Sequence, residues 1–223
     1  MFTGIIEALG EIAALEPCGG DLRLYIRSGD LPLDGVKLGD SIATNGVCLT
    51  AVALPGDGFW ADVSRETLNH SGFAQARVGQ KVNLERAMAA NGRFDGHIVS
   101  GHVDGVGVVL DAQKDARSLR LRIDAGQDLA RYIAAKGSIC VDGVSLTVNR
   151  VEGSVFELNI VPHTAEQTII PEYAAGTRVN LEVDVVARYL ERLLQAGALG
   201  SSGGLSLAKL AENGFVKNSF KGR

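Results

Sequence analysis

The stretch Asn45-Gly46-Val47-Cys48-Leu49-Thr50, NGVCLT, returns ninety-seven residues later as DGVSLT, residues 142–147. Asn-Gly and Asp-Gly between β-prone residues are typical of a two-residue hairpin turn, because both turn positions take a positive φ. Each stretch therefore predicts a tight β-hairpin. The exchange of Cys48 for Ser145 at the matched position indicates that two copies of one scaffold have diverged.

The same offset of 97 positions aligns much of the chain with itself. It pairs LRLYI (22–26) with LRLRI (119–123), and GQKVNLE (79–85) with GTRVNLE (176–182). A solenoid repeat is shorter than this period, whereas a small domain has this length. The sequence therefore predicts the duplication of a whole domain.

Within each copy the local patterns predict strands. LRLYI alternates apolar and polar residues, and so does the last strand of each copy. Several short strands separated by glycine-rich turns predict an all-β fold, with each copy a closed or nearly closed Greek-key barrel. Residues 65–73 and 162–170 predict short helices, with Thr67 or Thr164 as the N-cap.

A different pattern follows the second copy. Residues 183–197 predict an amphipathic helix that ends at Gly197. Its two faces are as follows: apolar Val186, Tyr189, Leu190, Leu193 and Leu194; charged Arg188, Glu191 and Arg192. The first copy has a linker, 86–97, in its place. The apolar face packs either in an oligomer interface or on its own barrel. Residues 198–223 predict a flexible tail that begins near GSSGG (200–204).

Composition narrows the class of protein. The chain has 223 residues, of which 46% are hydrophobic, and a net charge of −4, which argues against a nucleic-acid partner. It lacks an apolar run long enough to span a membrane, and its first residues lack the features of a signal peptide. Cys18, Cys48 and Cys140 form no CxxC motif, so we expect free thiols in a reducing cytoplasm.

Two polar positions each have a structural and a functional interpretation. Cys48 is either a small buried residue or a polarisable group lining a pocket at the barrel mouth, and the matched Ser145 favours the pocket. His102 either has a structural role or moves protons near neutral pH. His97 lies five residues earlier, an odd spacing that puts the two rings on opposite faces of a strand and argues against a two-histidine metal site.

Four threonines recur in matched pairs, Thr50 with Thr147 and Thr67 with Thr164. They reflect either β-propensity and helix capping or a set of hydroxyls that face a ligand. Motifs of nucleotide-phosphate binding and of triad hydrolysis are missing from the sequence. Cys140 lies opposite Ala43, and we expect it in the core.

Five motifs, in this order, resemble the riboflavin synthase family of the α-chain type. They are MFTGIIE (1–7), NGVCLT (45–50), GHIVSGHVDG (96–105), KGSICVDGVSLTV (136–148) and ARYLERLL (187–194). The resemblance covers nearly the whole chain, with the same duplication. It implies two six-stranded Greek-key barrels, residues 1–97 and 98–184, each binding one lumazine, followed by a helix at 185–197 and the tail.

The resemblance also implies an activity. Members of the family convert two molecules of 6,7-dimethyl-8-ribityllumazine into riboflavin and 5-amino-6-ribitylaminouracil, by transferring a four-carbon unit from one to the other. They use no metal and no redox cofactor. They form homotrimers through the C-terminal helix, and neighbouring subunits supply the productive pair of barrels. From charge, hydropathy and cysteine content we expect no nucleic-acid or membrane partner and a cytoplasmic location.

The resemblance assigns roles by position. Residues expected to act in catalysis are Phe2, Ser41, Cys48, His102, Ser145 and Asp184. Residues expected to line the site of the first barrel are Gly4, Ile5, Ile6, Cys48, Leu49, Thr50, Asp62, Val63, Ser64, Arg65, Glu66, Thr67, Gly101, His102 and Val103. Those expected at the second barrel are Ser145, Leu146, Thr147, Asn159, Ile160, Val161, Pro162, His163 and Thr164. Lys136 matches a lysine that reaches the substrate.

Two other functions deserve comparison. A non-catalytic, antenna-type protein of the same fold would bind lumazine or flavin, but such proteins tend to lose polar groups in one site, and here Cys48, His102 and Ser145 are all present. A flavin reductase would need a nicotinamide-binding domain, for which the chain has no room. One departure from the family pattern is Asp95, where a glycine is more usual.

Overall fold

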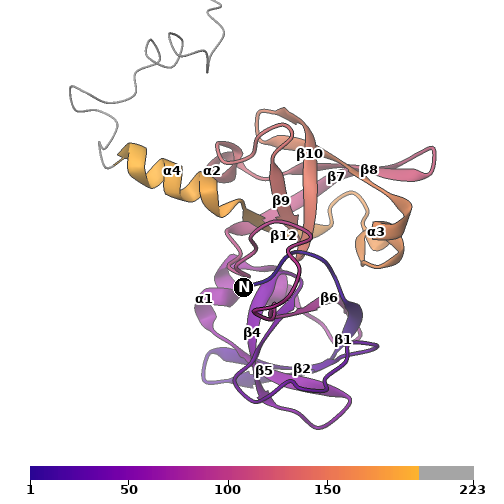
Figure 1. Cartoon of the computed structure of the whole chain (residues 1–223), viewed down its shortest axis with the longest axis vertical. Helices are drawn as coiled ribbons and strands as arrows, with labels where there is room; N and C mark the ends of the chain where they lie inside the picture. The colour runs from indigo at the N-terminus through magenta and orange to yellow at the C-terminus, as the bar shows by residue number, and fades with distance from the viewer. Residues whose placement is uncertain (196–223) are drawn as a thin grey trace, which may run out of the picture. The chain divides into compact units, whose positions relative to one another are not determined.

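The computed structural model describes residues 1–195 and contains two closed six-stranded barrels (Figure 1). The strands of the first barrel are β1 (Ala8–Cys18), β2 (Asp21–Arg27), β3 (Ser41–Thr44), β4 (Val47–Ala53), β5 (Gly58–Val63) and β6 (Lys81–Arg86). They close in the order β1-β2-β5-β4-β3-β6, and all their pairings are antiparallel. Since β3, β4 and β5 follow one another and β6 returns beside β3, the barrel contains a Greek key.

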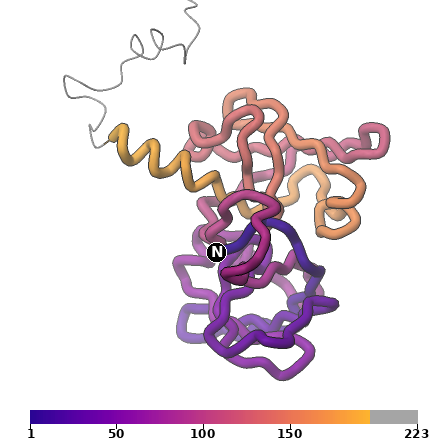
Figure 2. Tube along the Cα trace, viewed as in Figure 1, coloured from indigo at the N-terminus to yellow at the C-terminus, as the bar shows by residue number. Residues whose placement is uncertain are grey.

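The second barrel repeats this order. Its strands are β7 (Gly105–Asp115), β8 (Ser118–Asp124), β9 (Ser138–Val141), β10 (Val144–Glu152), β11 (Val155–Ile160) and β12 (Arg178–Val183). They close in the order β7-β8-β11-β10-β9-β12, and Figure 2 follows the chain through one barrel and then the other. The predicted fold of two tandem all-β barrels is confirmed. The domain limits at residues 97 and 184 stay predictions.

Short helices connect some of the strands. They are α1 (Arg65–His70), the 3₁₀ helix η1 (Gly72–Gln75), α2 (Gln127–Ala130), α3 (Pro162–Glu166) and the 3₁₀ helix η2 (Ile170–Glu172). The predicted caps are wrong, because both helices begin earlier in the chain. Ser64 caps α1 by accepting a hydrogen bond from the Thr67 N–H, and Val161 precedes α3, whose first residue is a proline.

Each barrel has its own core, built by the inward residues of its strands. Ile12, Leu24 and Phe59 are fully buried in the first barrel, and Leu121 and Phe156 in the second. Along β4, buried residues alternate with more exposed ones, as expected for a strand with one face on the core.

The two repeated hairpin turns meet at the contact between the barrels. Asn45 and Asp142 have φ values of 45° and 43°, and the glycines that follow have positive φ as well, so both turns have the predicted conformation. A Cβ atom on Gly46 would lie 2.7 Å from the Gly143 backbone nitrogen. Glycine is therefore required here by the close approach of the two turns as well as by φ.

Matched side chains join the barrels reciprocally. The Asn83 Nδ2 donates to the Asp142 carbonyl oxygen at 2.9 Å, and the Asn180 Nδ2 donates to the Asn45 carbonyl oxygen at 2.8 Å. Phe2 and Val99, which are also matched, pair as an isolated antiparallel bridge. The contact between the barrels thus has an approximate twofold symmetry. Cys140 is buried beside Phe2 and Val99, so its predicted place in the core is confirmed.

The C-terminal helix α4 (Val185–Gln195) confirms the predicted amphipathic helix over its described part. The side chains of its apolar face are each more than half exposed: Val186, Tyr189, Leu190, Leu193 and Leu194. The predicted last residues of the helix, 196 and 197, and the predicted tail lie outside the described residues. Among residues 1–195, no helix combines the length and apolar character needed to cross a membrane.

Candidate functional site

The residues that precede each barrel cross over to the other one. The Cys48 N–H of β4 donates to the Gly101 carbonyl oxygen at 2.9 Å, and the Ser145 N–H of β10 donates to the Gly4 carbonyl oxygen at 2.7 Å. Cys48 of the first repeat is therefore covered by the segment that precedes the second barrel, and Ser145 of the second repeat by the segment that precedes the first barrel. We call residues 2–6 and 99–103 the crossing segments.

The first half-site is a cavity of about 400 Å³ between the first barrel and the second crossing segment. It is lined by Val47, Cys48, Glu66, Thr67, His70, Ser71, Gly101, His102, Val103 and Asp104. Six of these residues are among those expected from the sequence. The half-site combines a thiol, two carboxylates, two hydroxyls and two imidazoles on a partly apolar wall, a composition typical of small-molecule sites.

Cys48 lies on the outer face of β4. Its neighbour Leu49 is 2% exposed in the barrel core, whereas Cys48 is half-buried under the crossing segment. Cys48 therefore lines a pocket, as one of its two interpretations expected, but this pocket lies over the outer face of β4 and not at the barrel mouth, because the side chain points away from the barrel interior. Across the cavity, His70 Nε2 lies 3.1 Å from Glu66 Oε1, one turn apart on α1.

Several residues expected in the first half-site have other surroundings. Leu49 and Val63 are core residues, and Asp62 forms an ion pair with Arg23 at 2.6 Å. The Arg65 N–H donates to Asp21, Ser64 caps α1, and Thr50 is exposed on β4. Grouping Gly4 with Cys48 was wrong, since Gly4 contacts Ser145 of the second barrel. The cause is the crossing of the two segments.

The second half-site is built around Ser145. His97 Nδ1 lies 2.6 Å from Ser145 Oγ, and Gly4 contacts the Ser145 backbone. Burial lowers the pKa of His97, and the carboxylate of Asp184 opposes this shift only in part. The imidazole is therefore held mainly neutral at pH 7. Its Nε2 atom is buried and has no hydrogen-bond partner among residues 1–195.

The other residues expected at the second barrel belong to β10, β11 and α3 or adjoin them. Ile160 is buried and Leu146 packs against the core, whereas Thr147, Asn159, Val161 and His163 are exposed. Pro162 is the first residue of α3, and the carbonyl oxygen of Thr164 accepts a hydrogen bond from Thr168. Lys136 is exposed, has a φ of 67°, and its N–H donates to Val148.

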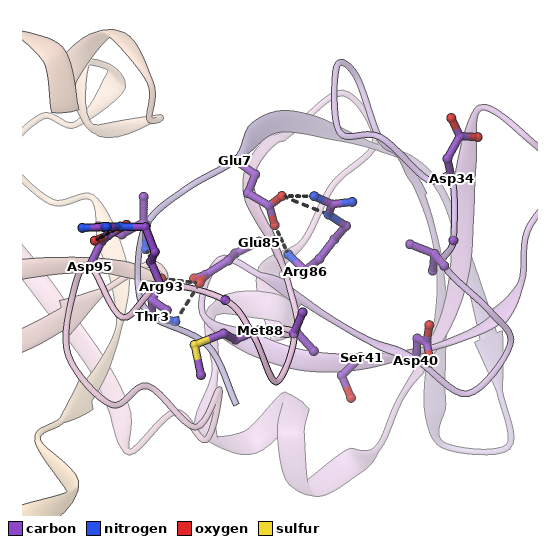
Figure 3. Close-up of a pocket in the computed structure, with 16 residues that line it drawn as sticks. Thr3, Glu7, Asp34, Asp40, Ser41, Glu85, Arg86, Met88, Arg93 and Asp95 are labelled. Atoms are coloured by element: carbon purple, nitrogen blue, oxygen red, sulfur yellow. Dashed lines mark hydrogen bonds and ion pairs between the residues drawn. The ribbon is translucent and has the colours of Figure 1, made fainter.

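Two further expected residues lie elsewhere. Phe2 is fully buried against Val99, so it anchors its segment rather than lining the described cavity. Ser41 lines a second cavity of about 690 Å³, shown in Figure 3 together with Thr3 and Glu85. Ile5 also lines this cavity, which is separate from the set of residues around Cys48.

His97 is the residue of the second half-site that sequence reasoning missed. Residues 97–104 form no continuous strand, so the expectation that His97 and His102 occupy opposite faces of one strand was wrong. They belong to different half-sites instead. No sequence signal joins His97 to Ser145, since residue 97 has no match in the first copy. His70 could have been found, because it lies one helical turn from Glu66.

Comparisons with known proteins match the two barrels. The family model described as Lumazine binding domain matches residues 3–87 and 100–184, one match per barrel. The riboflavin synthase of Photobacterium phosphoreum is 48% identical over 217 residues, covering 97% of this chain and all of the relative. That of Bacillus subtilis (strain 168) is 40% identical over 216 residues, covering 96% of this chain and all of the relative.

Solved structures of the protein LumP share the fold. LumP complexed with 6,7-dimethyl-8-(1'-D-ribityl) lumazine aligns with a TM-score of 0.74 at 26% identity, covering 82% of this chain and 99% of LumP. LumP complexed with riboflavin aligns with a TM-score of 0.77 at 27% identity, with the same coverage. The chain's identity to riboflavin synthases is higher than to LumP. This chain therefore belongs to the riboflavin synthase family, enzymes that transfer a four-carbon unit between two lumazine molecules.

Proposed function

We propose that this chain converts two molecules of 6,7-dimethyl-8-ribityllumazine into riboflavin and 5-amino-6-ribitylaminouracil, with one lumazine bound at each half-site. The observation that carries this proposal is the matched but chemically different pair Cys48 and Ser145 in two lumazine-binding domains. Each lies with a histidine, His102 in the cavity at Cys48 and His97 beside Ser145. The likeness to the synthases covers nearly the whole chain and supports the same reaction.

A duplicated scaffold suits this reaction because two identical molecules must take opposite roles. Similar half-sites bind the same ligand, while different polar groups bias one lumazine towards donor and the other towards acceptor. Holding the two molecules in a fixed orientation replaces a bimolecular encounter, which can lower the barrier by several kcal/mol, on the order of 7 or more in favourable cases.

The chemistry requires removal of a proton from the C7 methyl group of one lumazine. The conjugated ring makes this methyl acidic by delocalising the carbanion, so a modest base or a proton relay is sufficient. In the second half-site, neutral His97 and the Ser145 hydroxyl form such a relay through the contact between His97 Nδ1 and Ser145 Oγ. In the first, His102 and Cys48 supply polar groups inside the cavity.

The C-terminal helix supports assembly into a homotrimer. The apolar face is costly to leave in water, and further copies of this chain can cover it. Its five side chains are each more than half exposed: Val186, Tyr189, Leu190, Leu193 and Leu194. Productive pairs of half-sites would then come from neighbouring chains. Replacing Leu190 and Leu193 by glutamate should yield monomers in analytical ultracentrifugation and remove activity, whereas an unchanged sedimentation coefficient would argue against this interface.

The direct test is to mix the purified protein with 6,7-dimethyl-8-ribityllumazine and nothing else. Formation of riboflavin absorbance, with the aminouracil product in equal amount, supports the synthase. A stable spectrum of bound lumazine without turnover supports a non-catalytic, antenna-type protein, the alternative to which the LumP structures point. Absence of both would contradict the proposal.

A further inference from the structure

Two buried carboxylates occupy matched positions near the end of the last strand of each barrel. Glu85 of β6 is 4% exposed and Glu182 of β12 is 3% exposed. Neither residue lines the cavity around Cys48. A buried carboxylate is costly unless hydrogen bonds satisfy its oxygens, so their partners indicate what each group does.

Both carboxylates hold the backbone of a crossing segment. Glu182 Oε1 accepts from the Ser100 N–H at 2.6 Å, and its Oε2 accepts from the N–H groups of Gly101 at 2.9 Å and His102 at 3.0 Å. Glu85 Oε1 accepts from Thr3, through N–H at 2.6 Å and Oγ1 at 2.8 Å (Figure 3). Its Oε2 accepts from the Gly4 N–H at 2.9 Å.

Each crossing segment that a carboxylate holds contacts the half-site of the opposite barrel. Glu182 belongs to the second barrel, yet its segment brings Gly101 and His102 against Cys48 of the first. Glu85 belongs to the first barrel, and its segment brings Gly4 against Ser145 of the second. Charge-assisted hydrogen bonds are roughly twice as strong as neutral ones, so several of them to consecutive N–H groups hold the backbone of a segment in place.

We propose that Glu182 and Glu85 are positioning residues that act crosswise: Glu182 completes the half-site at Cys48, and Glu85 completes the half-site at Ser145. The inference rests on the proposed function for the identity of the ligand. It makes each half-site depend on a carboxylate from the other barrel, so binding at one of the two can be weakened separately.

Substitution by glutamine isolates this role. Glu182→Gln keeps the length of the side chain, but only one of its two terminal atoms still accepts hydrogen bonds, and the new NH₂ group faces N–H donors. At least one N–H group of the segment then loses its partner. The matched control is Glu85→Gln, which makes the same change at the equivalent position of the other repeat.

The cysteines provide a reporter for each half-site. Cys18 is exposed, whereas Cys140 is buried, so a Cys18→Ser background leaves Cys48 as the accessible thiol among the described residues. Its rate of reaction with DTNB is measured with increasing 6,7-dimethyl-8-ribityllumazine. A second reporter combines Cys18→Ser and Cys48→Ser with Ser145→Cys, which places the thiol in the other half-site.

We expect lumazine to protect both reporters in the parent backgrounds. Glu182→Gln should raise the lumazine concentration needed to protect Cys48 by roughly tenfold or more, the effect of losing a charge-assisted hydrogen bond, and leave protection of the residue-145 thiol within about threefold. Glu85→Gln should give the reverse pattern. This crossed pattern is one that a general loss of stability would not produce.

The remaining outcomes are each decisive. Parent proteins that lumazine fails to protect would count against the proposed function, and not against the positioning role. Protected parents with unaffected variants, or with variants that weaken both half-sites equally, would overturn the crosswise assignment. If Glu182→Gln fails to fold by circular dichroism, Glu182→Asp and Glu85→Asp, which keep the charge but shorten its reach, are scored by the same pattern.

Discussion

The Nδ1 atom of His97 lies 2.6 Å from the Oγ atom of Ser145, although 48 residues separate them in the chain. The contact exists because the linker between the barrels passes beside β10 before it enters the second crossing segment. Ser145 has a hydroxyl where the matched Cys48 of the first repeat has a thiol, whereas His97 has no matched residue in the first repeat.

Loss of the Ser145 hydroxyl should affect turnover more than binding. Ser145→Ala removes the hydrogen bond to His97 and should lower kcat by roughly 10²–10⁴-fold, the usual contribution of a proton-transfer group, while the Kd for lumazine changes by less than about tenfold. His102→Gln should have the same effect from the first half-site. Steady-state kinetics measures kcat, and titration with lumazine measures Kd. Equal losses in turnover and in binding would mean that these residues have only a structural role.

The pH dependence should report the neutral state of His97. Because burial lowers the pKa of His97, protonation should inactivate the enzyme only below the usual value of 6.5. The acidic limb of the kcat/KM profile should therefore lie below pH 6.5 and should disappear in His97→Gln, whose remaining activity is lower. A limb that persists unchanged in this variant would have to belong to another group.

The carboxyl at the turn of the second hairpin should make stability depend on pH. Burial raises the pKa of Asp142 from 3.8 to about 7, and hydrogen bonds from Tyr173 and Asn180 oppose the shift. Because the folded-state pKa is higher, the folded chain binds more protons than the unfolded chain between these values, and stability falls as pH rises through that range. Above pH 7, the buried, ionised carboxylate of Asp142 lowers the free energy of unfolding.

Asp142→Asn should therefore stabilise the protein at pH 8 by roughly 1–4 kcal/mol, with a gain below about 1 kcal/mol at pH 4.5. Urea unfolding at the two pH values measures this difference. The reciprocal Asn45→Asp should destabilise the protein at pH 8, since Asn45 occupies the matched turn of the first repeat. If Asp142→Asn changed the free energy of unfolding equally at both pH values, titration of Asp142 would not be the cause.

The contact between the hairpin turns should make one glycine more sensitive than another. Gly46 and Gly79 both have positive φ, 76° and 84°, but only Gly46 faces the backbone of the other barrel, since a Cβ on Gly79 meets nothing within 4 Å. Gly79→Ala should cost about 1–2 kcal/mol from φ alone. Gly46→Ala should cost about 1–3 kcal/mol more, the usual penalty for overpacking, in urea unfolding. Equal costs would mean that the turns do not constrain each other.

Much of the fold could be predicted because its signals are local and repeated. The Asn-Gly and Asp-Gly turns specify hairpins, and alternation specifies which side of each strand faces a core, as Leu49 and Cys48 show. The offset of 97 positions then transfers each inference from one copy to the other. The cap at Ser64 was missed because hydroxyl residues at both positions 64 and 67 suit a helix start.

The half-sites could be predicted only in part. The sequence by itself determined the two barrels, the matched Cys48 and Ser145, and the amphipathic helix, because these depend on periodicity and turn chemistry within short stretches. Tertiary structure alone decided which crossing segment contacts which half-site: Gly4 contacts Ser145, and Gly101 contacts Cys48. It also decided that His97 contacts Ser145 in the second half-site. Those contacts arise from the packing of one barrel against the other, and hydrogen bonds between distant segments leave no local pattern in the chain.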